Sequence, residues 1–192
     1  MDIALPESLV GQLTVLRSNL TAVLIAISYL DKTPAGDTLE RRTVIVSRTG
    51  FRVLPKTPRP DEVSKDDYIS SVHVGSADGR NLLVSGPASA AVRSLILESF
   101  EVTKTRCVET GLGPVLRKEP WYHYVRLLRN ALTHGGYWSF RRYDRNLLPL
   151  SWSGLTISAE MDGAVVSGQF ADWYRALEIS DALIDFAERL SK

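Results

Sequence analysis

One short stretch of the chain gathers side chains that could act on a phosphate group. Arg129, Asn130 and His134 lie close together in the sequence, and Arg126 comes three residues before them. An imidazole titrates near neutrality and can serve as a general base or acid. A guanidinium binds phosphate through two donors and stabilises negative charge there. Together these groups could cleave an RNA phosphodiester without a metal ion, with the 2′-hydroxyl as the internal nucleophile.

These side chains are predicted to occupy the polar face of a helix that begins near Glu119 and ends at Gly135–Gly136. At about 100° per residue, one half of this helix is apolar and should pack against the protein. It consists of Trp121, Tyr124, Val125, Leu127, Leu128, Ala131 and Leu132. The other half is polar and consists of His123, Arg126, Arg129, Asn130, Thr133 and His134.

The two reactive side chains do not sit on the same line of this helix. Arg129 and His134 are separated by about 140° around the axis, so one helix would not easily close both around a small ligand. Two copies facing each other across a twofold axis would bring each arginine near the other chain's histidine. The geometry therefore favours a site shared by a homodimer, formed through this helix.

The same residues also have a purely structural interpretation. A cationic side chain in the last helical turn, followed by glycine, is a common way for a helix to end. Arg126 and Arg129 could equally be ordinary solvent-facing cations. Cys107 and His134 could in principle form a nucleophile and its base, but Cys107 is expected on the apolar side of a helix, where packing is the better explanation.

Other recognisable chemistry is absent from the sequence. It contains no glycine-rich phosphate loop with its lysine, and no HExxH, CxxC or GxSxG motif. The histidines at 73, 123 and 134 have no partners at metal-ligand spacing, so neither a metal nor a cofactor is predicted.

Four helices with β insertions are predicted to position this stretch within a single domain, residues 1–192. A first helix over 6–32 carries a heptad seam that could pack inside a bundle or form a dimer interface. A β-rich insertion at about 38–86 shows two hairpin signals, 43–46 with 51–54 and 71–74 with 81–84. A second helix opens at Pro87, and a last one runs from about Phe170 to Leu190. A small β insertion at about 147–168 is expected to pair strands 155–158 and 164–166. The fold class is mainly α, an antiparallel four- to five-helix bundle.

Composition is that of an ordinary globular protein, with 44% hydrophobic and 23% charged residues over 192 positions. The single cysteine rules out an intrachain disulfide and favours a reducing compartment. Because no signal peptide is recognised and the longest uncharged run, 18–30, is too short to span a bilayer, a cytoplasmic location without a membrane partner is expected.

The net charge of +1 conceals two basic stretches, 41–59 and 117–145, and an acidic C-terminal stretch. The basic stretches could meet an anionic partner, although the charges could also balance in three dimensions.

The stretch from Arg129 to His134 resembles the Arg–x(4–6)–His motif of the HEPN domain superfamily, in its form with a polar residue after the arginine. The aromatic Trp121, Tyr122 and Tyr124 before it and the β insertion after it are also similar to bacterial HEPN families. The resemblance covers roughly residues 80–190, and in outline the first helix; 38–86 match nothing recognisable.

The resemblance implies a metal-independent endoribonuclease, dimeric, in toxin–antitoxin, phage-defence or RNA-processing systems. It implies that Arg129 contacts the scissile phosphate and that His134 activates the 2′-hydroxyl or protonates the leaving oxygen. Asn130 would orient one of these two side chains or tie the two motifs together, and the products would carry 2′,3′-cyclic phosphate ends. RNA is the implied partner, with an antitoxin or a nucleotidyltransferase-like protein beside it. The basic residues expected to contact the RNA backbone are Arg126, Arg141, Arg142 and Arg145. Since some HEPN domains are inactive, the alternative is a non-catalytic module that binds a nucleotide or a partner protein. A third hypothesis is a bundle protein whose dimer seam along the first helix is purely structural.

Overall fold

The computed structural model of the chain describes residues 8–32, 42–47, 50–54, 68–72 and 77–191, with side chains for 8–26 and 86–191. The chain divides into two compact units. One contains residues Met1–Ala22 and Ser89–Lys192, and the other contains Val23–Ala88. Helix α1 (Leu9–Lys32) and helix α3 (Ala77–Glu109) each run from one unit into the other. The candidate site belongs entirely to the first unit.

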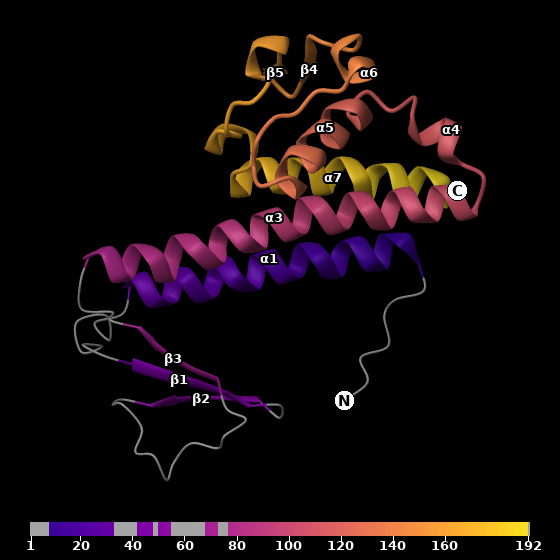
Figure 1. The fold of residues 1–192 in the computed structure, drawn as a ribbon. Coiled ribbons are helices and arrows are strands. Elements are labelled where there is room, and N and C mark those ends of the chain that lie inside the picture. Colours follow the sequence, from indigo (N-terminus) through magenta and orange to yellow (C-terminus); the bar gives the residue numbers. More distant parts are fainter. Residues whose placement is uncertain (1–7, 33–41, 48–49, 55–67, 73–76, 192) are drawn as a thin grey trace. The chain divides into compact units, whose positions relative to one another are not determined.

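The second unit contains a three-stranded antiparallel sheet in the order β2-β1-β3 (Figure 1). Strands β1 (Arg42–Ser47) and β2 (Gly50–Leu54) pair with Ser47 opposite Gly50, which confirms the first predicted hairpin. Gly50 itself lies in the strand, and the turn falls outside the described residues. Strand β3 (Tyr68–Val72) pairs with the other edge of β1.

The second predicted hairpin is wrong. Residues 81–84 are the second turn of α3, which already begins at Ala77 and carries Pro87 inside it rather than at its start. A short apolar run such as Leu82–Val84 cannot be assigned to strand or helix by periodicity alone. Proline removes one helical hydrogen bond and disturbs the preceding turn, but the 33-residue helix continues through it.

The first unit is mainly helical. In it α3 runs alongside α1, and helices α5 (Tyr122–Thr133) and α7 (Trp173–Leu190) pack on α3 (Figure 1). The predicted seam of α1 contributes Leu13 and Leu20, which are fully buried, and an ion pair joins Arg17 to Asp181 of α7. The short helix α4 (Gly113–Leu116) follows α3. Helix α7 begins at Trp173, because the Asp172 carboxylate caps its first turn.

Aromatic contacts fix helix α5 on three sides. The Tyr122 ring lies 5.8 Å from Phe100 of α3, and Trp121 meets Phe186 of α7 edge-on at 5.9 Å. Tyr124 contacts Trp152 of strand β4 (Leu150–Trp152) at 5.5 Å. All seven residues of the predicted packing face are buried. Such burial contributes roughly 2 kcal/mol for each large side chain, so the orientation of the polar face is set by packing.

The small β insertion differs from its predicted pairing. Strand β4 (Leu150–Trp152) pairs with β5 (Leu155–Ile157), not β5 with 164–166. The turn between them is Ser153–Gly154, and both residues have positive φ, as a type I′ hairpin turn requires. Residues Ala159–Met161 form a 3-10 turn, and Val165 makes an isolated bridge to Tyr137. Between α5 and β4 lies the short helix α6 (Arg142–Arg145).

One described helix, over Leu9–Ala26, is long and apolar enough to cross a membrane by length and composition alone. Buried core helices and N-terminal signal sequences pass the same test. The uncharged run 18–30 begins directly after Arg17, whereas the segment Leu9–Ala26 includes this one charged residue.

Candidate functional site

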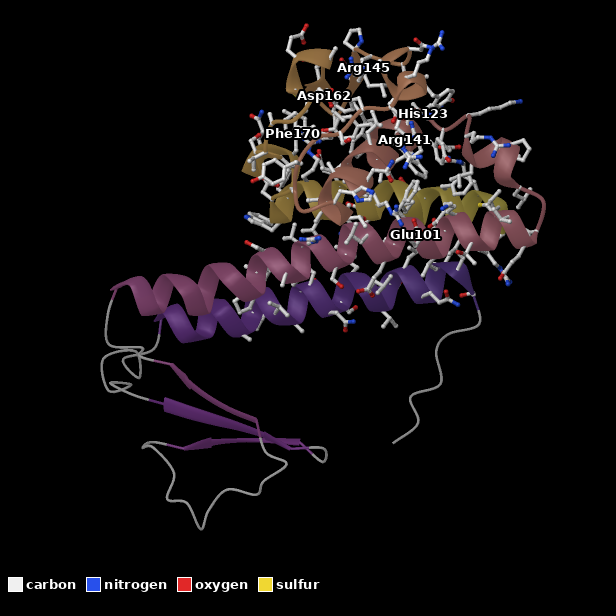
Figure 2. The ribbon with its side chains drawn as sticks, viewed as in Figure 1. Glu101, His123, Arg141, Arg145, Asp162 and Phe170 are labelled. Carbon is white, nitrogen blue, oxygen red and sulfur yellow. The ribbon has the colours of Figure 1, made fainter. Side chains whose placement is uncertain are left out.

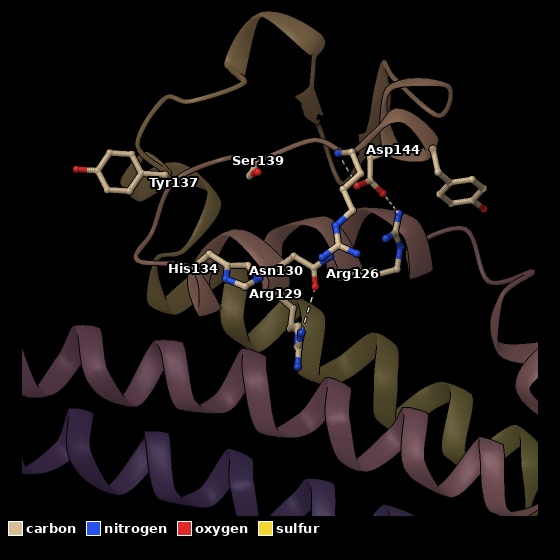
Figure 3. A pocket seen from close by; sticks show the side chains of 9 residues that line it. Arg126, Arg129, Asn130, His134, Tyr137, Ser139 and Asp144 are labelled. Carbon is tan, nitrogen blue, oxygen red and sulfur yellow. Dashed lines mark hydrogen bonds and ion pairs between the residues drawn. The ribbon is translucent and has the colours of Figure 1, made fainter.

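The polar face of α5 forms one wall of an open groove of about 800 Å³ (Figure 3). The opposite wall is the return segment, residues 137–144, which follows the helix and folds back over it. The groove is lined by Arg126, Arg129, Asn130, His134, Tyr137, Ser139, Arg141, Tyr143 and Asp144. The three residues of the predicted motif therefore line one cavity within a single chain, together with two further arginines and one carboxylate.

Arg129 is held by a carboxylate from a different helix. One guanidinium nitrogen lies 2.8 Å from Glu101 of α3. Another donates to the Asn130 side-chain oxygen at 3.1 Å (Figure 3). Lys104 stands 3.6 Å from the second oxygen of the same carboxylate. The Arg129 side chain keeps 26% of its surface exposed, so it is partly covered rather than fully solvated. An anion in the groove therefore competes with Glu101 for this guanidinium.

Arg126 is paired more tightly. Its guanidinium lies 2.5 Å from Asp144, a side chain that is only 4% exposed. The same carboxylate accepts the backbone N–H of Arg141 at 3.0 Å, which begins helix α6. The guanidinium also lies over the ring of Tyr143, 5.7 Å from its centre. Asp144 thus links the N-terminal end of α6 to Arg126 on the polar face of α5.

His134 ends helix α5. It occupies the C-cap position with φ −96° and ψ 43°, and its backbone N–H donates to the Asn130 carbonyl. Gly135 and Gly136 follow with φ of +83°, a conformation that side chains disfavour, and reverse the chain. Within the described residues, no hydrogen bond or ion pair engages the exposed His134 imidazole. The imidazole is therefore available to a ligand in the groove.

The return segment is anchored by its buried aromatic residues. Trp138 packs edge-on against Phe170 at 5.3 Å, and the backbone N–H of Phe140 donates to Asp162. Because consecutive residues of an extended segment point to opposite sides, burying positions 138 and 140 turns positions 137, 139 and 141 outward. Those three are the residues of the segment that line the groove ahead of α6.

The four arginines predicted to contact RNA are divided by the structure. Arg126 and Arg141 line the groove, but Arg142 and Arg145 do not. Arg145 is bound to Asp162 at 2.6 Å and donates to the Phe140 carbonyl, so it stabilises the return segment (Figure 2). Arg142 is exposed on helix α6.

His123 lies on the same polar face but outside the groove lining. Burial lowers the pKa of its imidazole, and the nearby Arg126 cation lowers it further, while Asp144 opposes this shift. Burial similarly raises the pKa of the Cys107 thiol, and Cys107 lies in the core at 0% exposure, where packing was expected to place it. Among the described residues, no cluster of three or more His, Cys, Asp or Glu could hold a metal ion.

Sequence reasoning missed the two carboxylates, Glu101 and Asp144, and the aromatic lining residues Tyr137 and Tyr143. Glu101 is 28 residues from Arg129, and no local pattern connects them. Asp144 had a signal, since it is the only acidic residue among the arginines of 137–146.

The structure thus defines a mainly helical protein with an arginine- and histidine-lined groove. Comparison of the chain with protein-family models, with curated proteins and with solved structures found no match.

Proposed function

We propose that the protein is a metal-independent endoribonuclease of HEPN type whose active groove is the one formed by helix α5 and the return segment. The observation that carries the proposal is the gathering of Arg129, Asn130 and His134 in a single groove, with Arg126 and Arg141 beside them. Guanidinium and imidazole groups suffice for phosphodiester transesterification, and an open groove admits a polymer.

In the proposed reaction, the ribose 2′-oxygen forms a bond to phosphorus and the bond from phosphorus to the 5′-oxygen breaks. The proton of the 2′-hydroxyl passes to an imidazole acting as general base, and a second acid protonates the departing oxygen. The products are a 2′,3′-cyclic phosphate and a 5′-hydroxyl. Arg129 neutralises the phosphate once an RNA oxygen has replaced Glu101, and Asn130 holds the guanidinium through its side-chain oxygen.

A homodimer through α5 supplies the second acid–base group, because an isologous contact presents the same helix from each chain. In this arrangement His134 of one copy acts as base and His134 of the other as acid. The role as a toxin or a phage-defence component, with an antitoxin or nucleotidyltransferase-like partner, is part of the same proposal.

A second candidate is a non-catalytic module of the same class that binds a nucleotide. Binding requires only the cations of the groove, whereas cleavage also requires a second acid–base group from another copy of the chain. The two candidates differ in whether bound RNA is cleaved.

The test is incubation of purified protein with total RNA in EDTA, beside His134→Ala and Arg129→Ala. Arg142→Ala is a matched control, because Arg142 is an exposed arginine outside the groove. Cleavage by the wild type and the control, and its loss in both motif variants, is the expected result. Equal cleavage by the motif variants, or none by the wild type, contradicts the catalytic proposal.

A further inference from the structure

Two exposed tyrosines line the groove in addition to its cations. Tyr137 keeps 52% of its surface exposed and Tyr143 keeps 59%, although most large apolar side chains of this unit are buried. Neither ring is needed for the core. Exposed aromatic faces interleaved with arginines are the usual composition of a surface that binds unpaired nucleic acid.

The two rings lie at opposite ends of the groove. Figure 3 shows Tyr137 at the end where His134 closes helix α5. Tyr143 belongs to the other end, because its ring lies 5.7 Å from the guanidinium of Arg126. Arg126 and His134 are eight residues apart, which is about 12 Å along a helix.

A separation of this size spans about three to four base steps, so the two rings would meet different bases that are not neighbours in the strand. Successive bases of one strand in a duplex are spaced by about 3.4 Å along the axis. A ring can stack only on a base that offers a free face, and the interior of a duplex offers none because each base is covered by its neighbours. Unpaired RNA stacks its exposed bases on aromatic side chains.

The cations support the same geometry. Arg126 lies over one face of the Tyr143 ring, and with more than half of the residue exposed, ring surface remains for a base. Arg129, Asn130 and Arg141 line the groove along with the two rings, where the phosphate backbone would cross. Together they provide phosphate contacts flanked by two stacking surfaces.

We infer that Tyr137 and Tyr143 are base-stacking residues that select an unpaired RNA segment with its backbone over Arg129. This inference rests on the proposed function, since it assigns the substrate form for the same groove. It goes beyond the reaction because it names the residues that distinguish single strands from duplexes.

Binding, rather than cleavage, tests the inference. The probe is a fluorescent eight-nucleotide RNA with 2′-O-methyl groups, which lacks the nucleophile and stays intact, and the readout is anisotropy over a range of salt concentrations. The variants are Tyr137→Leu, Tyr143→Leu and the corresponding phenylalanine changes. Tyr174→Leu is the matched control, because Tyr174 is 58% exposed on α7 and does not line the groove.

Each leucine variant is expected to weaken binding by about 5- to 150-fold, the range for loss of one base–aromatic stack. The slope of affinity against salt should stay unchanged, because no phosphate contact is lost. Phenylalanine variants and the control should bind as the wild type does, and a duplex of the same sequence should not respond to the leucine changes.

Two results overturn the inference in distinguishable ways. Tight binding by the wild type that the leucine changes leave intact refutes the stacking role alone. No binding of either RNA form by the wild type refutes the proposed RNA function together with it.

Discussion

Replacing Asp144 with asparagine should lower the free energy of unfolding by about 3 kcal/mol. Removing one partner of a buried ion pair costs roughly 3–5 kcal/mol, because the other charge is left uncompensated. The lower end applies, since Asp144 is 4% exposed but Arg126 is 21% exposed and keeps some hydration. Asparagine retains an oxygen for the backbone N–H of Arg141, so the ion pair is the main loss.

The assay is urea unfolding followed by circular dichroism. With a slope of about 2 kcal/mol/M, the midpoint should fall by about 1.5 M. Asp162→Asn is the matched control, because its partner Arg145 is 60% exposed and such surface pairs contribute only about 0–1 kcal/mol. A double-mutant cycle with Arg126→Met separates the pair's own coupling from other effects of each change.

The same change should strengthen RNA binding. Asp144 is the only acidic residue among those that line the groove, and its loss frees Arg126 for a phosphate. Opposite effects on stability and on RNA affinity are therefore expected from one substitution. If Asp144→Asn destabilises the protein no more than Asp162→Asn does, the ion pair with Arg126 does not stabilise the fold as described. If the folded variant binds RNA more weakly, Asp144 does not compete with phosphate for Arg126.

Three further predictions concern buried or paired groups near helix α5. Glu101→Gln should increase affinity for an RNA oligonucleotide, measured by anisotropy, because Arg129 loses its competing carboxylate; unchanged affinity would show that the pair does not compete with RNA. The pKa of His123 is lower in the folded protein than in the unfolded chain. As the pH falls below the ordinary pKa of 6.5, the unfolded chain therefore binds a proton first, and the free energy of unfolding should decline. His123→Gln should reduce that decline in unfolding measured from pH 8 to pH 5, and an identical profile would contradict the assignment. Tyr124→Phe should leave stability near its wild-type value at neutral pH, because the buried hydroxyl has no hydrogen-bond partner among the described residues. Burial raises the pKa of Tyr124 from 10 to about 12, so the wild type should lose stability as pH rises through that interval while the variant should not, as alkaline unfolding would show.

The packing of helix α5 could be predicted because one local rule decides it. The 3.6-residue period separated apolar from polar residues, and the apolar residues Val125 and Leu128 are fully buried. The end of the helix at His134 was equally local, since two glycines follow it.

The ion pairs that control the arginines could not be predicted in this way. Whether Arg129 is free or neutralised depends on how α3 crosses α5, which brings Glu101 to it over a separation of 28 residues. The second wall of the groove depends on Trp138 and Phe140 finding their buried positions. The misplaced strand at 81–84 has a different cause, because a short apolar run suits a strand and a helix equally well.

The most direct measurement uses a DNA oligonucleotide that contains a single ribonucleotide, incubated with the purified protein in EDTA. The proposal predicts one cut, immediately 3′ of the ribonucleotide, leaving a 2′,3′-cyclic phosphate that mass spectrometry identifies. His134→Gln should abolish the cut while the oligonucleotide still binds. Cleavage of an all-DNA control, or an intact single-ribonucleotide probe that the wild type binds, would contradict catalysis through the 2′-hydroxyl in this groove.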